Sequence, residues 1–237
     1  MRDVIYNNIR LNEYLIIKDV SESLLPDISN VSLKLNNSIG AKFIKQELGV
    51  RVFNIPVEII ADSISERQEL IDILAPIFYV NKEQELIIDN NRKYNVVLDG
   101  STDINNLMYD SEFTLIFVAH NPIAYGIEVE VDFKTGVKLS NNGNYKSDGV
   151  ITMFATSNVV RVQLKDGDPY DYIHVEGVKS GDLVNINMVD EVVKVNGVNY
   201  MKKTDPFGNF FSVPPGEFEI ELWGANKAYL KFNERWI

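Results

Sequence analysis

The pattern of apolar and polar residues changes midway along the chain. From Phe113 to Ala119 nearly every residue is apolar, β-branched or aromatic, and such a run predicts a strand covered on both faces. The strand is expected to end at Asn121-Pro122, because proline cannot donate a hydrogen bond to a strand ladder. We therefore predict two domains, an N-terminal one over residues 1–125 and a C-terminal one over residues 126–237.

The first part of the chain shows short strand patterns separated by turns. Residues 1–30 predict short strands and loops. Three strand candidates lie between Val31 and Ile60, where the turn signals are Asn36 to Gly40 and then Gly49. Their succession is typical of a meander, in which consecutive strands pair in one sheet.

One segment of the first part has the period of a helix instead. Ser65 with Gln68 three residues later forms the pattern of a capping box. The apolar residues that share one helical face are Leu70, Ile71 and Leu74. We predict a helix of about ten residues that ends near Pro76, because proline inside a helix costs roughly 3 kcal/mol.

Two hairpins are marked by their turns. Asn90-Asn91 separates the strand candidates Leu86–Ile88 and Tyr94–Leu98. Asn196-Gly197, between two valine-rich runs, is the strongest local signal in the chain, because a type I′ turn needs positive φ at both central residues.

The second part shows only strand and turn patterns. Apolar and polar residues alternate in Leu183–Met188 and in Glu217–Leu222, which predicts strands with one buried and one solvated face. The polar run from Ser140 to Asn144 predicts a surface loop. Several short strands at this spacing predict an antiparallel sandwich. The predicted fold class is therefore mainly β, with an α+β N-terminal domain that contains the helix.

Composition and charge narrow the range of partners. No apolar run is long enough to span a membrane, and the N-terminus lacks the pattern of a signal peptide, so we expect no membrane insertion. The net charge is −11, and residues 1–120 contain 18 acidic against 11 basic residues. Because such a surface repels phosphate, we expect no sequence-specific nucleic-acid binding. The chain has no cysteine, which excludes disulfides and thiolate metal sites.

Clusters of acidic residues and the two histidines are the first candidates for metal binding or catalysis. Asp166, Asp168 and Asp171 could offer oxygens to a calcium ion, but the spacing of an EF-hand is absent and an Asp-Gly turn explains them. His120 and His174 belong to no metal-binding or nucleophile motif. We interpret both as strand-end histidines that hydrogen-bond to the backbone, and predict no metal and no cofactor.

Acidic and aromatic residues of the second part are the remaining candidates. Glu217, Glu219 and Glu221 alternate on one strand face, and paired carboxylates serve glycoside hydrolysis. A solvated face is the simpler explanation, because a row of like charges needs water rather than a closed pocket. Trp223 and Trp236 could form a platform for a sugar, whereas buried packing is the commoner use of such rings. We find no catalytic constellation and predict that the chain is not an enzyme.

The order of these features along the chain resembles that of the distal tail proteins of long-tailed phages. After the junction strand and Asn121-Pro122, the features that carry the resemblance are Gly177 to Asp182 leading into a strand, the Asn196-Gly197 hairpin, Phe211 to Gly216, and a last strand closing on Arg235-Trp236. Each of these features alone is an ordinary turn signal with little specificity. The resemblance depends on their order, which spans almost the whole chain.

The resemblance implies a structural hub protein of a virion. It implies a hexameric ring at the tip of the tail tube, built by an N-terminal belt domain, with a galectin-like β-sandwich that holds other parts. The implied partners are the tail tube protein, a tail fibre or tail-associated lysin protein, and receptor-binding or baseplate proteins, with DNA passing through the ring. The chain would be made in the host cytoplasm.

Two other functions remain open at this point. One is a galectin-like carbohydrate-binding module fused to an unrelated domain. The other is a glycosidase that uses the glutamates of the sandwich face. Fold alone does not separate these, because a sandwich hosts many functions.

Overall fold

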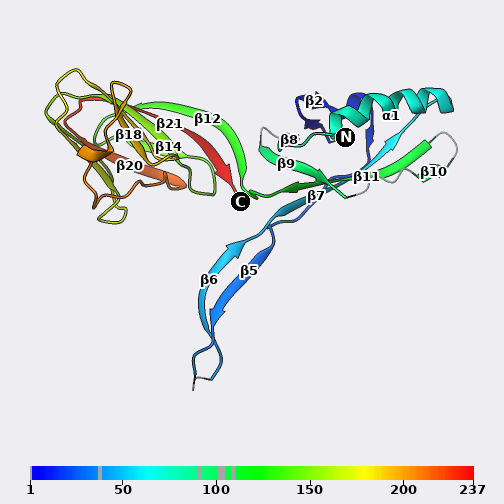
Figure 1. Ribbon diagram of the computed structural model, residues 1–237, viewed down its shortest axis with the longest axis horizontal. Coiled ribbons are helices and arrows are strands. Elements are labelled where there is room, and N and C mark those ends of the chain that lie inside the picture. Colours follow the sequence, from blue (N-terminus) through cyan, green and yellow to red (C-terminus); the bar gives the residue numbers. More distant parts are fainter. Residues whose placement is uncertain (1, 37–38, 90–91, 101–104, 108–109) are drawn as a thin grey trace. The chain divides into compact units, whose positions relative to one another are not determined.

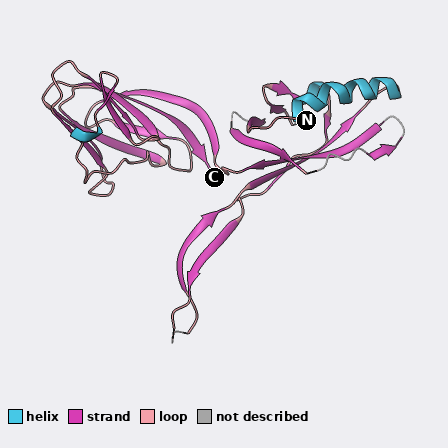
Figure 2. Cartoon of the chain, viewed as in Figure 1, coloured by secondary structure: helices cyan, strands magenta, loops and turns pink. Residues whose placement is uncertain are grey.

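The computed structural model describes residues 2–36, 39–89, 92–100, 105–107 and 110–237 (Figure 1). The chain divides into two compact units, Met1–Ala124 with Ile237, and Tyr125–Trp236. Antiparallel strands make up most of both units (Figure 2), which confirms the mainly β fold class. No helix in these described ranges is long and apolar enough to cross a membrane.

The first unit is built on two long strands. β7 (Arg51–Ile59) pairs with β11 (Asp110–Ala119), from Ser111 opposite Ile59 to Ala119 opposite Arg51. β9 (Lys93–Asp99) pairs with the other side of β11. The shorter strands that extend this sheet are β1 (Val4–Tyr6), β2 (Ile9–Arg10), β3 (Ile16–Ile17), β4 (Ser21–Glu22), β8 (Gln84–Ile88) and β10 (Asn105–Leu107), and a 3-10 turn spans Leu11–Glu13.

One face of the long strands forms the core of the first unit. On β11 the buried residues are Leu115, Phe117 and Ala119, whereas Ile116 and Val118 between them are only partly covered. The prediction that this strand is covered on both faces is therefore wrong. Its apolar residues continue onto the second face because β-branched side chains suit a pleated strand even when that face is only partly buried.

A helix covers the buried face of the sheet. α1 (Ile64–Phe78) buries Leu74, and Phe78 stacks on Tyr6 at 5.8 Å between ring centres. Tyr6 in turn contacts Phe117 at 4.8 Å, so one aromatic chain joins helix, edge strand and central strand.

The helix differs from its prediction at both ends. Its N-cap is Ser63, whose hydroxyl accepts from the backbone N–H of Glu66, while the Glu66 carboxylate accepts from the N–H of Asp62. The capping box thus lies two residues earlier than predicted. The helix also runs through Pro76, because in the last turn only one backbone hydrogen bond is lost there.

The predicted meander is also wrong. Among the described residues, β5 (Ile28–Leu33) and β6 (Lys42–Leu48) pair only with each other, and form a two-stranded ladder outside the main sheet (Figure 1). Backbone hydrogen bonds between Asp27, Gly49 and Val50 close the base of this hairpin. The predicted turn at its tip includes residues 37–38, which lie outside the described residues, as do residues 90–91 of the turn between β8 and β9.

The second unit is a sandwich of two antiparallel sheets. One sheet has the order β19-β18-β17-β14-β21-β12, and the other has the order β13-β20-β15-β16. The bounds are β12 (Ala124–Phe133), β13 (Lys138–Asn141), β14 (Gly149–Phe154), β15 (Val159–Leu164), β16 (Tyr172–Glu176), β17 (Leu183–Asn187), β18 (Val192–Val195), β19 (Val198–Asn199), β20 (Gly216–Trp223) and β21 (Ala228–Trp236), with a 3-10 turn at Met201–Lys203. Phe218 and Phe232 meet edge to face in the core between the sheets.

Most local predictions for the second unit are confirmed, with one correction. Val184 and Ile186 of β17 and Met188 directly after it are buried as predicted, and the inward face of β20 is apolar. The run from Ser140 to Asn144 is not a surface loop throughout, since Asn141 is only 1% exposed. Asn141 is the last residue of β13; its amide donates to the carbonyl of Pro214, and its oxygen accepts from the N–H of Gly143.

Candidate assembly surfaces

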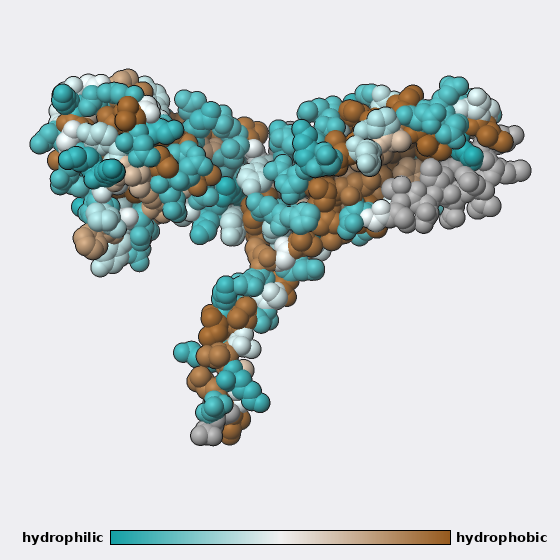
Figure 3. Space-filling view, in the orientation of Figure 1, coloured by the Kyte–Doolittle hydropathy of each residue, from teal (hydrophilic) through white to brown (hydrophobic). Residues whose placement is uncertain are grey.

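The hairpin formed by β5 and β6 exposes several large apolar side chains. We call residues 26–49 the arm. Its exposed large apolar side chains are Ile28, Leu33, Leu35, Ile39, Phe43 and Ile44, and apolar surface runs along its length in Figure 3. An isolated two-stranded hairpin is at best marginally stable in water, so the arm lacks the cover that such a hairpin needs.

The far part of the arm is basic in an acidic protein. Residues 33–45 contain the lysines Lys34, Lys42 and Lys45 and no acidic residue. Lysine is a common means of keeping an exposed strand from pairing at random. The same residues would favour an acidic partner surface.

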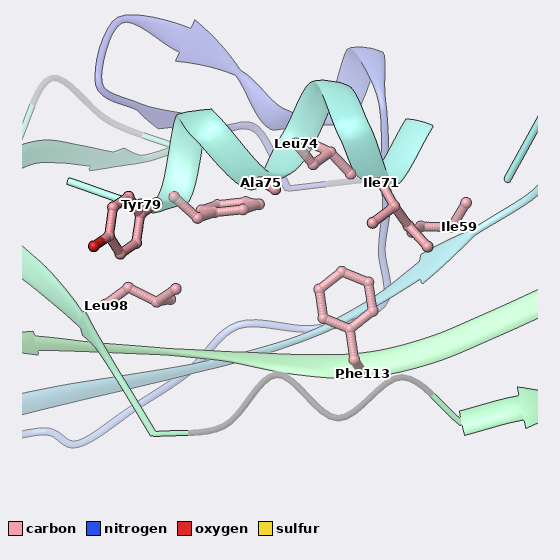
Figure 4. A pocket seen from close by; sticks show the side chains of 8 residues that line it. Ile59, Ile71, Leu74, Ala75, Tyr79, Leu98 and Phe113 are labelled. Atoms are coloured by element: carbon pink, nitrogen blue, oxygen red, sulfur yellow. The ribbon is translucent and has the colours of Figure 1, made fainter. Parts of the chain in front are cut away.

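A groove opens between α1 and the sheet of the first unit. Its volume is about 260 Å³, and it is lined by Ile59, Ile71, Leu74, Ala75, Phe78, Tyr79, Leu98 and Phe113. Figure 4 shows Leu98 and Phe113 rising from the strands toward the helix, with Ile59 close to Ile71. Tyr79, directly after the helix, is 92% exposed. The groove is therefore apolar inside and ends on an exposed aromatic ring.

The helix that borders the groove carries acids on its solvent side. Asp62, Glu66, Glu69 and Asp72 are all exposed, and with Arg67 they give residues 62–78 a net charge of −3. Glu66 is near the helix N-terminus, where the helix dipole favours a negative charge. None of these acids is among the side chains that line the groove.

The second unit has a cluster of charged and aromatic groups on its smaller sheet. The Arg161 guanidinium lies 4.0 Å from the ring centre of Tyr172 and 5.6 Å from that of Trp223. The Tyr172 hydroxyl donates to Asp205, which raises the pKa of Tyr172. The backbone N–H of Phe207, with that hydroxyl, holds the pKa of Asp205 below its usual range. The cation thus stacks on both rings, while the anion is held by hydrogen bonds.

The acidic residues considered for metal binding or catalysis do not lie together in one site. The side chains of Asp168 and Asp171 accept from backbone N–H groups of their own turn, and Asp166 has a positive φ of 60°. Glu217 and Glu219 form ion pairs with Lys138 and Lys165. Within the described residues, no group of three or more His, Asp and Glu side chains could hold a metal ion.

His120 lies at a strand end as predicted, whereas His174 does not, and the neighbour of each ring differs from the predicted backbone partner. His120 follows β11, and its Nδ1 lies 3.6 Å from a carboxylate oxygen of Glu83. His174 lies in the middle of β16, and its Nε2 is 3.4 Å from a carboxylate oxygen of Glu176. The partner is in each case a carboxylate, not the backbone.

The two tryptophans differ from each other. Trp223 is 45% exposed beside Arg161, so buried packing was the wrong interpretation for it. The Trp236 ring lies over Gly126, where a Cβ would fall 2.1 Å from a ring carbon. Only glycine fits under that ring.

Sequence reasoning missed the arm and the groove. The strand pattern of Ile28–Leu33 and Lys42–Leu48 looks like that of sheet strands, and only the interleaved lysines distinguish it. The groove combines residues of α1, β7, β9 and β11. No local pattern could have placed those side chains together.

Comparisons with known proteins cover both units. A family described as "Phage tail protein RIFT-related domain" matches residues 9–119, and one described as "Siphovirus-type tail component, C-terminal domain" matches residues 142–236. No curated protein matches the chain.

Two solved structures match along nearly the whole chain. The crystal structure of SPP1 Dit, titled a paradigm of hub adsorption apparatus in phages that infect Gram-positive hosts, is 15% identical over all of both chains, with a TM-score of 0.85. A chain of the phage p2 baseplate in its activated conformation with Sr is 12% identical over 98% of each chain, with a TM-score of 0.48. The first likeness shows that the fold is shared along the whole chain.

Proposed function

The chain belongs to the distal tail protein family of siphoviruses, and from this membership we propose that six copies form a ring at the tip of a phage tail tube. The family is a structural component of phage tails and is not an enzyme family. In the proposed role the ring joins the tube to the parts that recognise the host, and the protein is carried in the virion.

The observation that carries the ring is the arm. Six large apolar side chains of the arm are exposed in the single chain, most of them by about half. Burying the exposed remainder of each against a partner would contribute on the order of 1 kcal/mol. A hairpin of this kind supports an obligate assembly, in which subunit contacts bury about 2,000 Å² or more.

The two units suit two different partners. We assign the first unit, which contains the arm and the groove, to the ring and to the tail tube protein. The second unit has a core of its own between two sheets. We assign it to the tail fibre or tail-associated lysin protein and to receptor-binding or baseplate proteins.

The acid surplus of the first unit suits a channel that DNA passes. Residues 1–120 have a net charge of −7, and a ring of lysines and arginines would instead retain DNA by counterion release. Six copies of even two acids facing the channel would act together across a Debye length of about 8–10 Å.

The channel proposal has a direct binding test. The purified ring should not retain duplex DNA in a filter-binding assay, even at low salt, where phosphate contacts are strongest. Retention that strengthens steeply as salt is lowered would show a basic inner surface and contradict the acidic channel.

The lectin alternative is weakened by the geometry of the sandwich. Arg161 already stacks on Tyr172 and approaches Trp223, so it takes up ring surface that a sugar would use. We expect the chain to bind no glycan on an array. Binding at millimolar or tighter affinity would favour the carbohydrate-binding module instead.

The location of the protein tests the proposed function. Gold-labelled antibodies against the chain should mark one end of purified phage tails in electron micrographs, at the end that carries the fibres. Antibodies against the tube protein serve as the matched control, because they should mark the tail along its length. Label spread along the tube or absent from the tip would contradict the hub role.

A further inference from the structure

The first unit has a small polar pocket next to β4, β8 and β9. Its volume is about 160 Å³, and it is lined by Arg2, Glu22, Ile88, Asp89, Arg92 and Tyr94. We propose that this pocket binds the carboxylate of an acidic side chain from another protein. The proposal does not depend on the ring, because a single chain supplies every lining residue.

The hydroxyl of Tyr94 is the group that calls for a ligand. Tyr94 is only 7% exposed and lines the pocket, and within the described ranges no hydrogen bond joins its hydroxyl to another residue. Nearly all buried hydroxyls have a partner, since an unsatisfied one loses the hydrogen bonds it made to water. A ligand that accepts from this hydroxyl inside the pocket would restore the missing bond.

Positive charge lies on both sides of the same hydroxyl. The Arg51 guanidinium is 5.7 Å from the centre of the Tyr94 ring. Burial raises the pKa of Tyr94, whereas the charges of Arg51 and Arg92 act to lower it. The hydroxyl therefore stays protonated at neutral pH, as a donor next to two cations. An anionic acceptor fits such a donor, because hydrogen bonds to charged groups are the stronger ones.

Arg51 itself has no carboxylate partner among the described residues. It is only 4% exposed, and its Nη1 donates to the carbonyl of Ser23, while its Nε and Nη2 have no hydrogen-bond partner. A buried cation without a counter-ion is costly. An anion at the Tyr94 hydroxyl would lower this cost through space, because charges interact strongly where water is excluded.

The acids of the pocket leave this role open. Asp89 accepts from the backbone N–H of Asp3, and its second carboxylate oxygen lies 3.3 Å from Nε of Arg2, so its charge is already balanced. Glu22 is exposed on β4.

The balance of charge and the size of the pocket select a single carboxylate. With Arg51 behind the Tyr94 ring, three arginines face two acids, although residues 1–120 have a net charge of −7. One excess positive charge matches one carboxylate, whereas a phosphate dianion would meet repulsion from the two acids. A volume of about 160 Å³ is enough for the end of a side chain.

Ligand-observed NMR tests the site with a minimal probe. N-acetylglutamate α-amide carries one side-chain carboxylate, and N-acetylglutamine α-amide has the same shape without the charge. At equal concentration and ionic strength, saturation transfer from the full chain to the glutamate probe should be about fivefold greater or more. Equal transfer to both probes would overturn the proposal. Displacement of the glutamate probe by less inorganic phosphate than acetate would make this a phosphate site instead, and would also overturn it.

The variant Tyr94→Phe removes the donor and keeps the ring. Phe53 at 4.7 Å between ring centres and the Arg51 guanidinium retain their contacts. The melting temperature without probe should not fall, because the hydroxyl has no partner to lose, while binding of the glutamate probe should weaken about fivefold or more. A lower melting temperature with unchanged probe binding would give the hydroxyl a purely structural role and contradict the site.

Two matched controls separate the pocket from general effects. Tyr170→Phe makes the same change at an exposed tyrosine of the second unit, and should leave probe binding unchanged. Arg92→Gln removes a positive charge from the pocket lining and should weaken binding. Lys202→Gln removes one from an exposed position of the second unit and should not. Equal weakening by Arg92→Gln and Lys202→Gln would show attraction to the whole protein, and no specific pocket.

Discussion

Asn196 and Gly197 have positive φ angles of 49° and 81°, which is the geometry of a type I′ turn between β18 and β19. Nothing lies within 4 Å of a Cβ added at Gly197. Glycine is therefore favoured at position 197 because of the positive φ angle, and not because neighbouring atoms would clash with a side chain. That is why the prediction from two residues was correct.

Replacing Gly197 by Val should destabilise the sandwich by about 1–2 kcal/mol, because a β-branched residue resists positive φ. The measurement is the free energy of unfolding of the full chain in urea. Lys194→Val adds a similar side chain at an exposed strand position of the same hairpin, and should have little effect. An unchanged stability in Gly197→Val would contradict the turn assignment.

A carboxylate next to this turn should make stability depend on pH. The side chain of Asp182 accepts from the backbone N–H of Lys179 and from the Asn196 amide, and these bonds hold its pKa below the usual range. A lowered folded-state pKa means that the stabilisation is present above the ordinary value of about 3.9 and is lost as pH falls through the folded value.

The variant Asp182→Asn should therefore have a lower melting temperature than the wild type at pH 7, since its amide faces the Asn196 donor. The gap between the two proteins should narrow below about pH 3.9. A gap of the same size at pH 7 and pH 3 would show that the carboxylate charge is not involved.

At the scale of an element, α1 shows which features of a helix a local sequence pattern predicts and which it does not. Its existence and its apolar face followed from the spacing of Leu70, Ile71 and Leu74. Its start did not, because Ser63 and Ser65 are both good caps, each followed three residues later by a Glu or Gln. Tertiary packing of Phe78 on Tyr6 then extends the helix past Pro76.

Two alanine variants test which serine caps the helix. Ser63→Ala should cost about 1 kcal/mol of stability, because it removes the acceptor of the Glu66 N–H. Ser65→Ala lies inside the first turn and is exposed, so its effect should be within about 0.5 kcal/mol. Chemical denaturation compares the two directly, and the reverse order would place the cap at Ser65.

For the strands of the arm, the sequence predicted the positions but not the pairing. Sequence located β5, β6 and β7, since apolar residues and turns delimit each of them. It did not reveal that β7 pairs with β11 while β5 and β6 leave the sheet, because pairing depends on residues about 60 positions away. The groove was unpredictable for the same reason.

At the scale of the whole molecule, the two units have separate cores. β12 belongs to the sandwich and begins at Ala124, and its partly buried residues Val129 and Val131 pack against the sandwich core. The second unit should therefore fold only if this strand is included.

A fragment of residues 125–237 should unfold in one cooperative transition when followed by circular dichroism. A fragment of residues 134–237 lacks β12, and should melt at a lower temperature or without cooperativity. Equal transitions for the two fragments would contradict the place of β12 in the sandwich.

The mass of the wild-type chain in solution tests the central claim most directly. Light scattering at tens of micromolar should approach six times 27.0 kDa, about 162 kDa. A particle of 27.0 kDa at that concentration, with the arm intact, would contradict a ring held together by the chain's own surfaces.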